Sequence, residues 1–290
     1  MVFSIFNEML DVSISDIGAE LMSIKTKDKT EYLWQGNPKF WDGRAYNLFP
    51  IIGRLNQGVY IYNGQEFKMQ LHGFLRTSKL EVINHQKSSI TFELKYNNAT
   101  LYQYPFKFLI RISYELVKNK INVKYNVVNL DDKPMYFNIG AHPGFNVPLK
   151  PRLNFDDYFV EFKDICKIKK HELNEDYCFM SGKVIDYELL NGRIIPLNHK
   201  MFEYDTYIFS DTSKTATLKS ISDEKSVIIN FPDFKYFAMW SNKTAPFVCL
   251  ELWQGLPSSA YKIDDLQKKS DIITLEENKE YNNSWSIEIR

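Results

Sequence analysis

The sequence predicts an all-β protein that folds as one large single-domain β-sandwich with a few short helices. Aromatic residues make up 15% of the chain, and aromatic side chains favour strands. Apolar and polar residues alternate over many short segments, which is the pattern of a strand with one buried face. No segment keeps a helical period for more than about three turns, and no linker or repeat divides residues 1–290.

The first half of the chain is expected to form a strand followed by a series of strand pairs. Asn63-Gly64 is the strongest signal, because Asn-Gly readily adopts the positive φ angles that a two-residue hairpin turn requires. Residues 37–43 interrupt the alternation and predict a loop. The expected strands are 10–14, 21–30 paired with 32–34, 59–62 with 66–69, 80–83 with 90–96, and 108–117 with 121–128.

The second half is also expected to be mostly extended, with one short helical turn at 198–204 and a short helix at 263–269. Its apolar runs are short and bounded by turn residues, which favours strands over helices. The expected extended segments are 155–162, 165–168, 205–209, 216–221, 227–231, 236–240, 247–253, 272–275 and 285–289.

The stretch 137–148 contains the first candidate for chemistry, His142. Here the alternation stops, and the histidine lies among Gly140, Pro143 and Gly144, which favour turns. We therefore expect a turn that positions the imidazole, a group that titrates near neutrality and can act as acid or base. A histidine hydrogen-bonded at a strand end would fit the same residues.

Glu251 is the second candidate, because it is the only charged residue in the strongly apolar segment 247–253. An ionised carboxylate in a dry core is costly, so this side chain is expected to be paired, protonated or facing a cleft. A cleft with a raised pKa would suit catalysis. A salt-bridged core glutamate is the alternative.

Five further residues are weaker candidates for the site: Arg54, His72, Asp205, Trp240 and Trp253. Arg54 and His72 each adjoin a glycine in a turn, but such residues are more often solvated or structural than functional. Asp205 could begin a strand or cap the turn before it. The two tryptophans belong either to the core or to the wall of a ligand pocket, where a flat face could stack on a sugar ring.

Charge, hydropathy and cysteine content limit the classes of partner and the location that we expect for the protein. Lys and Arg together number 36, as do Asp and Glu, and this zero net charge argues against a nucleic-acid partner. No stretch approaches the ~20 apolar residues that span a bilayer, and the first ten residues do not resemble a signal peptide. Three cysteines without metal-like spacing favour reduced thiols in the cytoplasm. The sequence contains neither metal-ligand spacing nor a cofactor motif, so a small neutral ligand fits best.

Four short motifs and one aspartate occur in an order that matches a known family. They are Phe49-Pro50-Ile51-Ile52-Gly53-Arg54, His72-Gly73-Phe74-Leu75-Arg76, Gly140-Ala141-His142-Pro143-Gly144-Phe145, Asp205 and Cys249-Leu250-Glu251-Leu252-Trp253. This set resembles the aldose 1-epimerase (galactose mutarotase-like) family, and within it the branch around the lactose-operon X protein. The resemblance spans Leu10 to Trp285. It implies a large β-sandwich, a sugar substrate and no cofactor.

The resemblance also implies a role for each candidate. Glu251 matches the general base and His142 the general acid, while Arg54, His72 and Asp205 match the residues that hold the sugar hydroxyls. Opening a sugar ring with this pair moves only protons, and it requires a protonated His142. We therefore expect the nearby carboxylate to raise the pKa of His142.

Two departures from the best-known mutarotases leave the sugar open. Leu252 stands where proline usually follows the glutamate. The stretch His142-Pro143-Gly144-Phe145 stands in place of His-Thr-Tyr-Phe.

Three functions are compatible with the resemblance. The first is an aldose 1-epimerase, or mutarotase, acting on a free hexose such as galactose or glucose. The second is a hexose-6-phosphate 1-epimerase, since the phosphate-preferring branch also carries a His-Gly-Phe-x-Arg stretch; Arg76 and Arg44 would then converge on the phosphate. The third is a sugar-binding protein that keeps the fold without turnover.

Overall fold

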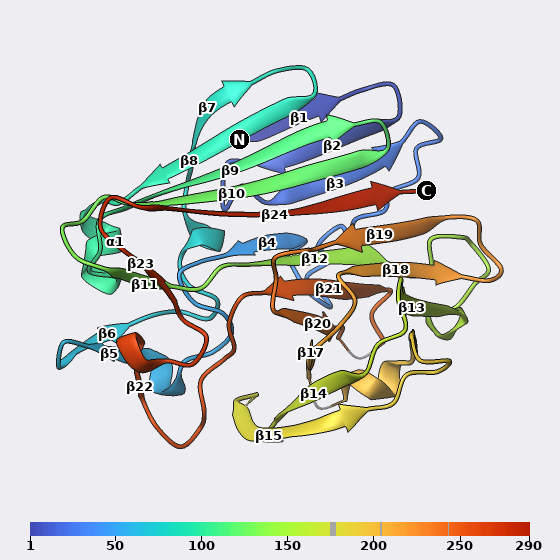
Figure 1. Ribbon diagram of the computed structural model, residues 1–290. Helices are drawn as coiled ribbons and strands as arrows, with labels where there is room; N and C mark the ends of the chain where they lie inside the picture. Colours follow the sequence, from blue (N-terminus) through green and yellow to red (C-terminus); the bar gives the residue numbers. More distant parts are fainter. Residues whose placement is uncertain (175–177, 204, 243) are drawn as a thin grey trace.

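The computed structural model describes residues 1–174, 178–203, 205–242 and 244–290. Two large antiparallel sheets dominate it (Figure 1). The nine-stranded sheet has the order β16 (Ile194–Pro196), β13 (Tyr158–Phe162), β18 (Thr215–Ser220), β19 (Ser226–Asn230), β24 (Glu280–Ile289), β10 (Lys120–Asn129), β9 (Phe108–Val117), β8 (Ser89–Lys95) and β7 (Glu81–His85). The seven-stranded sheet has the order β15 (Met180–Tyr187), β14 (Ile168–Leu173), β17 (Tyr207–Ser210), β20 (Tyr236–Trp240), β21 (Phe247–Trp253), β12 (Gly140–Asn146) and β4 (Ala45–Leu48).

Smaller sheets and short helices complete the fold. The small sheets are β1 (Val2–Phe6), β2 (Leu10–Ser15) and β3 (Leu21–Thr26); β22 (Asp264–Asp265), β5 (Val59–Tyr62) and β6 (Gln65–Lys68); and β11 (Met135–Phe137) with β23 (Ile273–Leu275). The helix α1 (Asn98–Gln103) is accompanied by the 3-10 turns η1 (Asn56–Gly58), η2 (Leu75–Thr77), η3 (Phe155–Asp157), η4 (His199–Phe202) and η5 (Leu266–Lys268).

Burial along the strands follows the alternation in the sequence. In β9 and β10 every second residue is buried, and these side chains belong to one apolar cluster that extends from Ile5 to Ile289. By contrast, β12 and β21 are buried along almost their whole length. Both faces of these two strands are therefore covered, one by the main core and the other by side chains on the far side of the sheet.

A buried polar network ties β4 to the nine-stranded sheet. The Tyr125 hydroxyl, on β10, donates to Asn47 Oδ1 (2.6 Å), and Asn47 Nδ2 donates to the hydroxyl of Tyr114 on β9 (3.0 Å). Asn47 Nδ2 also donates to the carbonyls of Gly18 and Ala19 (2.9 and 3.0 Å). Because satisfied buried networks specify one arrangement of their groups, β4 has a fixed position at the edge of its sheet.

The predicted all-β sandwich is confirmed, and several local predictions agree with it. Asn63-Gly64 joins β5 to β6, and the two other predicted hairpins are β7 with β8 and β9 with β10. Residues 37–43 lie outside the strands, as expected for a loop. The turn predicted at 198–204 is η4, and its last residue, Tyr204, lies outside the described residues.

Other local predictions are wrong. Residues 32–34 form no strand, and the predicted pairing with 21–30 is reduced to a bridge between Lys25 and Glu31 and a hydrogen bond from the Tyr32 N–H to the Ile24 carbonyl (3.0 Å). Leu33 makes an isolated bridge to Phe145. Residues 165–167 are not in a strand, because β14 begins at Ile168. The short helix predicted at 263–269 is confirmed only over Leu266–Lys268, as the 3-10 turn η5, because Asp264 and Asp265 form the short strand β22.

The helix α1 was not expected. Asn97 caps it by accepting a hydrogen bond from the Thr100 N–H (3.0 Å). A helix of six residues is too short to produce a periodic pattern of apolar residues.

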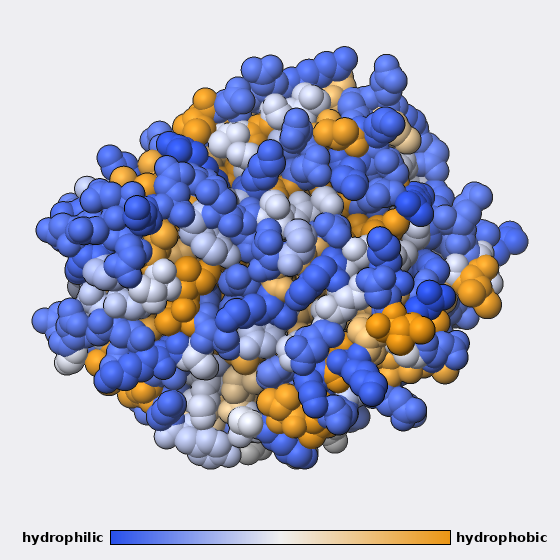
Figure 2. All heavy atoms as spheres, in the orientation of Figure 1, coloured by the Kyte–Doolittle hydropathy of each residue, from blue (hydrophilic) through white to orange (hydrophobic). Residues whose placement is uncertain are grey.

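The face of the molecule in Figure 2 is mainly hydrophilic, and its apolar side chains form small separate groups. This face therefore carries no large apolar patch of the kind that marks an interaction surface. Within the described ranges, no helix has the length and the apolar character that crossing a bilayer requires.

Candidate active site

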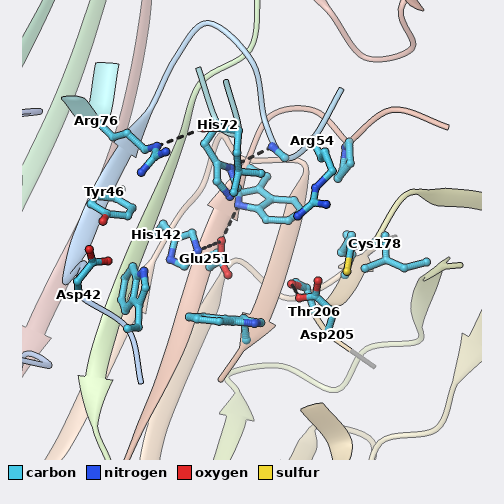
Figure 3. A pocket seen from close by; sticks show the side chains of 18 residues that line it. Asp42, Tyr46, Arg54, His72, Arg76, His142, Cys178, Asp205, Thr206 and Glu251 are labelled. Carbon is cyan, nitrogen blue, oxygen red and sulfur yellow. Dashed lines mark hydrogen bonds and ion pairs between the residues drawn. The ribbon is translucent and has the colours of Figure 1, made fainter. Parts of the chain in front are cut away.

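A cavity of about 320 Å³ lies on the face of the seven-stranded sheet opposite the main core (Figure 3). Strand β21 explains this position, because successive side chains of a strand point to opposite faces. Glu251 and Trp253 line the cavity, whereas Leu250 and Leu252 belong to the main core. One strand thus contributes both to the stability of the sandwich and to the floor of the cavity.

Three residues of the cavity lie side by side on the adjacent strands β4, β12 and β21: Tyr46, His142 and Glu251. His142 of β12 pairs with Tyr46 of β4. Strand β12 also pairs with β21, with Ala141 opposite Leu252. The next residue along each strand is therefore His142 opposite Glu251. Opposite residues of an antiparallel pair have their Cβ atoms about 4.5–5.5 Å apart, so the register itself brings the imidazole and the carboxyl group together.

The predicted turn at His142 is wrong, since His142 lies inside β12. Neither neighbouring glycine has a positive φ. Their missing side chains instead leave room on a strand covered on both faces. A Cβ on Gly144 would be 3.0 Å from Cζ3 of Trp41, and a Cβ on Gly140 would be 2.8 Å from the carbonyl oxygen of Leu252. Close packing, not chain reversal, interrupts the alternation here.

Glu251 and His142 form a buried pair. Oε2 of Glu251 is 3.2 Å from Nε2 of His142, and it accepts a hydrogen bond from Nε1 of Trp253 (3.0 Å). Glu251 is 0% exposed and His142 7%. Oε1 of Glu251 and Nδ1 of His142 have no hydrogen-bond partner among the described residues. Each member of the pair therefore keeps one polar atom unused.

Burial sets the protonation of this pair. Loss of water favours the neutral form of each group, so burial raises the pKa of Glu251 well above its ordinary value and lowers the pKa of His142 to about 3. The prediction that the carboxylate raises the pKa of His142 is therefore wrong, because the carboxyl group is itself held neutral and supplies no negative charge.

His72 is held as a hydrogen-bond donor. The backbone N–H of Gly53 donates to the ring nitrogen Nδ1 of His72 (3.0 Å). The backbone N–H of His72 in turn donates to the Gly53 carbonyl (2.9 Å). Burial, together with the neighbouring His142, Arg76 and Arg54, lowers the pKa of His72 well below its usual value. A neutral ring that accepts at Nδ1 carries its proton on Nε2. His72 therefore offers an N–H donor at the cavity, with its ring edge-to-face against His142 at 5.5 Å.

We expect Gly73→Ala to destabilise the protein and to displace the adjacent His72. Gly73 has a φ of +76°, and a Cβ there would overlap the carbonyl oxygen of Phe49. The left-handed backbone alone costs a residue with a side chain roughly 1–2 kcal/mol, and the overlap adds to that cost. Gly64→Ala is a matched control, because Gly64 also has a φ of +76° but nothing within 4 Å of the Cβ position. Urea titrations should find the larger loss of unfolding free energy for Gly73→Ala; equal losses would contradict the crowding.

On one side of the buried pair the cavity is lined by Arg54, Asp205, Thr206 and Cys178 (Figure 3). Asp205 has a φ of +96°, which is uncommon for a residue with a side chain, and its Oδ1 accepts a hydrogen bond from Thr206 Oγ1 (2.8 Å). Burial and a hydrogen bond to Asp205 raise the pKa of the Cys178 thiol to about 12. Strained backbone of this kind concentrates at functional sites. This side offers a carboxylate and a guanidinium to the hydroxyls of a ligand.

Asp42, Tyr46 and Arg76 line the opposite side of the cavity (Figure 3). The Arg76 guanidinium lies over the Tyr46 ring, 5.3 Å from its centroid. Its Nε donates to the Leu71 carbonyl (3.2 Å). These contacts fix the guanidinium at the wall of the cavity through Nε and its flat face.

The structure brings together all eight site residues named from the sequence. They are Arg54, His72, Arg76, His142, Asp205, Trp240, Glu251 and Trp253. Arg44, suggested as a second phosphate ligand, does not line the cavity; its Cζ is 3.1 Å from the position of a Cβ on Gly36. The sequence analysis missed Trp41, Asp42, Tyr46, Cys178 and Thr206. Of these, only Trp41 had a signal in the sequence that could have identified it, as a large aromatic residue in a predicted loop.

In the described part of the chain, no three His, Cys, Asp or Glu side chains are grouped so as to hold a metal ion.

The sequence and the fold are similar to those of known proteins. The family model of aldose 1-epimerase matches residues 1–286, and the chain belongs to this family. It is 33% identical over 287 residues to the plasmid-encoded Protein LacX of Lactococcus lactis subsp. lactis, an alignment that covers 94% of each chain.

Two solved structures are similar over the whole chain. One is a galactose mutarotase related enzyme from Lactobacillus acidophilus, with a TM-score of 0.95 and 32% identity, covering 100% of this chain and 97% of that one. The other is a galactose mutarotase-like protein from Lactobacillus casei ATCC 334, with a TM-score of 0.95, 31% identity and full coverage of both chains.

Proposed function

We propose that the protein is an aldose 1-epimerase that interconverts the α and β anomers of an unphosphorylated hexose. The observation that carries the proposal is the Glu251–His142 pair, whose Oε1 and Nδ1 atoms lack partners among the described residues. Buried polar atoms without partners are costly, and the hydroxyl and ring oxygens of a sugar would satisfy them. The similar Lactobacillus acidophilus protein is called a galactose mutarotase related enzyme, which supports the same reaction here.

In the proposed mechanism, Glu251 takes the proton from the anomeric hydroxyl while His142 protonates the ring oxygen, and the ring opens. Rotation about the first carbon–carbon bond and reclosure on the other face give the opposite anomer. Each proton then returns to the group that it came from. General acid–base catalysis of this type contributes roughly 10²–10⁴-fold. His72, Arg54 and Asp205 are proposed to hold the remaining hydroxyls, with Arg76, Trp240 and Trp253 completing the binding site.

A neutral resting pair is compatible with this mechanism. Oε2 of Glu251 and Nε2 of His142 are 3.2 Å apart. Moving one proton from the carboxyl group to the imidazole produces the carboxylate base and the imidazolium acid without changing the total charge of the pair. Interacting groups of this kind titrate as a unit. The state of the pair that the mechanism requires is the one with a single titratable proton, carried either by Glu251 or by His142.

The charges around the cavity favour a free sugar over a 6-phosphate. Binding a phosphate dianion tightly needs cations that converge on it. Arg54 and Arg76 lie on opposite sides of His72 (Figure 3), and each shares its side of the cavity with a carboxylate, Asp205 or Asp42. Those carboxylates would repel a phosphate but would accept hydrogen bonds from hydroxyls.

Polarimetry of freshly dissolved α-galactose, α-glucose and their 6-phosphates tests the proposal. We expect the protein to speed the rotation change of a free hexose above the rate in the same buffer without protein. The kcat/KM for the best free sugar should exceed that for its 6-phosphate by about tenfold or more, which corresponds to ~1.4 kcal/mol.

Two outcomes would contradict this reading. Preference for a 6-phosphate would support the hexose-6-phosphate 1-epimerase instead. Sugar binding by calorimetry without any acceleration would support a binding protein without turnover.

We also propose a cytoplasmic location, since Cys166, Cys178 and Cys249 are free thiols.

A further inference from the structure

Trp41 lies over the imidazole of His142, although the two residues are 101 positions apart in the chain. Their ring centroids are 5.0 Å apart, with planes inclined by 33°. Trp240, Tyr46 and His72 meet the same imidazole edge-on, at 5.8, 6.3 and 5.5 Å. Of these four rings, Trp41 is the one inclined least to the imidazole.

The loop that carries Trp41 is fastened in place. The Trp41 N–H donates to the Asn37 carbonyl (3.0 Å), and Nε1 of Trp34 donates to the Trp41 carbonyl (2.9 Å). Nδ2 of Asn242 donates to the carbonyl of Phe40, the preceding residue (2.7 Å). These bonds hold the backbone on both sides of the indole, so its position over the sheet is defined by the loop and not by the imidazole alone.

Two glycines make room for the indole. A Cβ on Gly43 would be 2.6 Å from Cζ2 of Trp41, and a Cβ on Gly144 would be 3.0 Å from Cζ3. Distances below about 3.4 Å are too short for an ordinary carbon–carbon contact, whose optimum is about 3.5–4.0 Å. The strand that carries His142 and the loop that carries Trp41 are thus both shaped to fit one ring.

Hydrogen bonds alone hold the imidazole weakly. Nδ1 of His142, which the proposed mechanism leaves for the sugar, has no hydrogen-bond partner in the part of the chain that the structure describes. The ring contacts Glu251 through Nε2. A functional histidine is oriented by its hydrogen bonds, and one contact at Nε2 does not fix the rotation of the ring about that contact. The indole packed over one face of the imidazole restricts that rotation.

We propose that Trp41 is a positioning residue for His142: its packing over the imidazole keeps Nε2 directed at Glu251 while Nδ1 stays free for the sugar. This inference rests on the proposed acid–base role of the pair. The indole face also attracts the imidazolium that forms when His142 receives a proton, through a cation–π interaction.

The test compares Trp41→Leu, which removes the aromatic face, with Trp41→Phe, which retains one. Phe40→Leu is the matched control. Phe40 packs against the same aromatic cluster, edge-on to Trp34 at 6.1 Å, but it does not line the cavity. A loss that came only from loosening the cluster would appear in the control as well. If Trp41→Leu does not fold, Trp41→Gln replaces it, since Trp41 is only partly buried.

The first readout uses no substrate. ¹⁵N NMR of the His142 ring, assigned with a His142→Asn variant, reports which nitrogen carries the proton. We expect one tautomer in the wild type, Phe40→Leu and Trp41→Phe, and a mixture in Trp41→Leu. The second readout is the rate of anomer exchange. We expect kcat to fall about tenfold to a hundredfold in Trp41→Leu, the scale of a misplaced catalytic group, with KM within about threefold of the wild type and with most of the loss recovered in Trp41→Phe.

Two results would overturn the inference. One is a single, unchanged tautomer in a folded Trp41→Leu protein. The other is a rise in KM at constant kcat, which would make Trp41 a wall for the sugar and not a support for the imidazole. If the wild type does not exchange anomers at all but the tautomer changes as expected, the proposed function fails while the positioning of His142 by Trp41 stands.

Discussion

Glu251→Gln is expected to lower kcat for anomer exchange by about 10²–10⁴-fold, the usual contribution of a general base. Gln has the shape of Glu, and its Oε1 can still accept the hydrogen bond from Nε1 of Trp253, but it cannot take up a proton. The measurement is the initial rate of rotation change on the preferred hexose. Glu161→Gln is the control, because Glu161 is paired with Arg193 and Lys219 on the nine-stranded sheet and should leave kcat unchanged.

The same substitution is expected to stabilise the folded protein as the pH rises. Burial raises the pKa of Glu251 in the folded state above its ordinary value of 4.5. The stability that the wild type gains from a neutral Glu251 is therefore complete below pH 4.5 and is lost as the pH rises toward the folded pKa. The loss is about 1.4 kcal/mol per pH unit in that window. Gln does not ionise, so Glu251→Gln should gain on the wild type between pH 5 and pH 8 in urea titrations. A constant difference across this range would show that the carboxyl group is ionised throughout.

His142→Asn is expected to lower kcat by a similar factor of about 10²–10⁴, because the ring oxygen loses its proton donor. The double variant Glu251→Gln/His142→Asn should be little worse than either single variant, since residues that act as a unit are strongly non-additive. His171→Asn is the matched control: His171 is on the same sheet, in β14, and contacts Ser210 outside the cavity lining. Losses that multiply in the double variant would mean that the two groups act independently.

The pH dependence of stability in His142→Asn should have the opposite sign. Burial lowers the pKa of His142 to about 3, below its ordinary 6.5. The stability that the wild type gains from a neutral His142 is therefore complete above pH 6.5 and is lost as the pH falls toward 3. The variant has no such loss, so its stability relative to the wild type should rise between pH 6.5 and pH 4. A difference that does not change over this range would contradict the burial of a neutral imidazole.

Much of the fold could be predicted because it is encoded locally. Alternation in β9 and β10 and the Asn63-Gly64 turn are properties of a few adjacent residues. The segment 247–253 was recognisable as a buried strand because all of its residues except Glu251 are apolar. That one exception identified the carboxyl group as a candidate for the cavity.

Predictions from neighbouring residues were wrong where contacts between distant segments determine the backbone or the pKa. Glycine and proline around His142 predicted a turn, yet they occur in a strand that is covered closely on both faces. Burial also reversed the expected pKa of His142, because the sequence does not reveal that the carboxyl group beside it is as dry as the imidazole. Both errors concern the environment of a side chain, which depends on contacts between distant segments.

The remaining site residues depend on long-range pairing. Tyr46 reaches the cavity because β4 pairs with β12, and this register cannot be read from either segment alone. Trp41 follows from the same pairing, since the loop before β4 is carried over His142. In contrast, Arg54, His72 and Asp205 were found through a family resemblance, and the cavity contains all three.

Anomer interconversion by the Glu251–His142 pair is tested most directly by two-dimensional exchange NMR on an equilibrium mixture of the preferred free hexose. The wild type should produce cross-peaks between the α and β anomeric protons at mixing times at which buffer alone gives none. Glu251→Gln and His142→Asn, folded and at the same concentration, should not produce them. Exchange at the buffer rate with the wild type, or undiminished exchange with both variants, would contradict anomer interconversion by the Glu251–His142 pair.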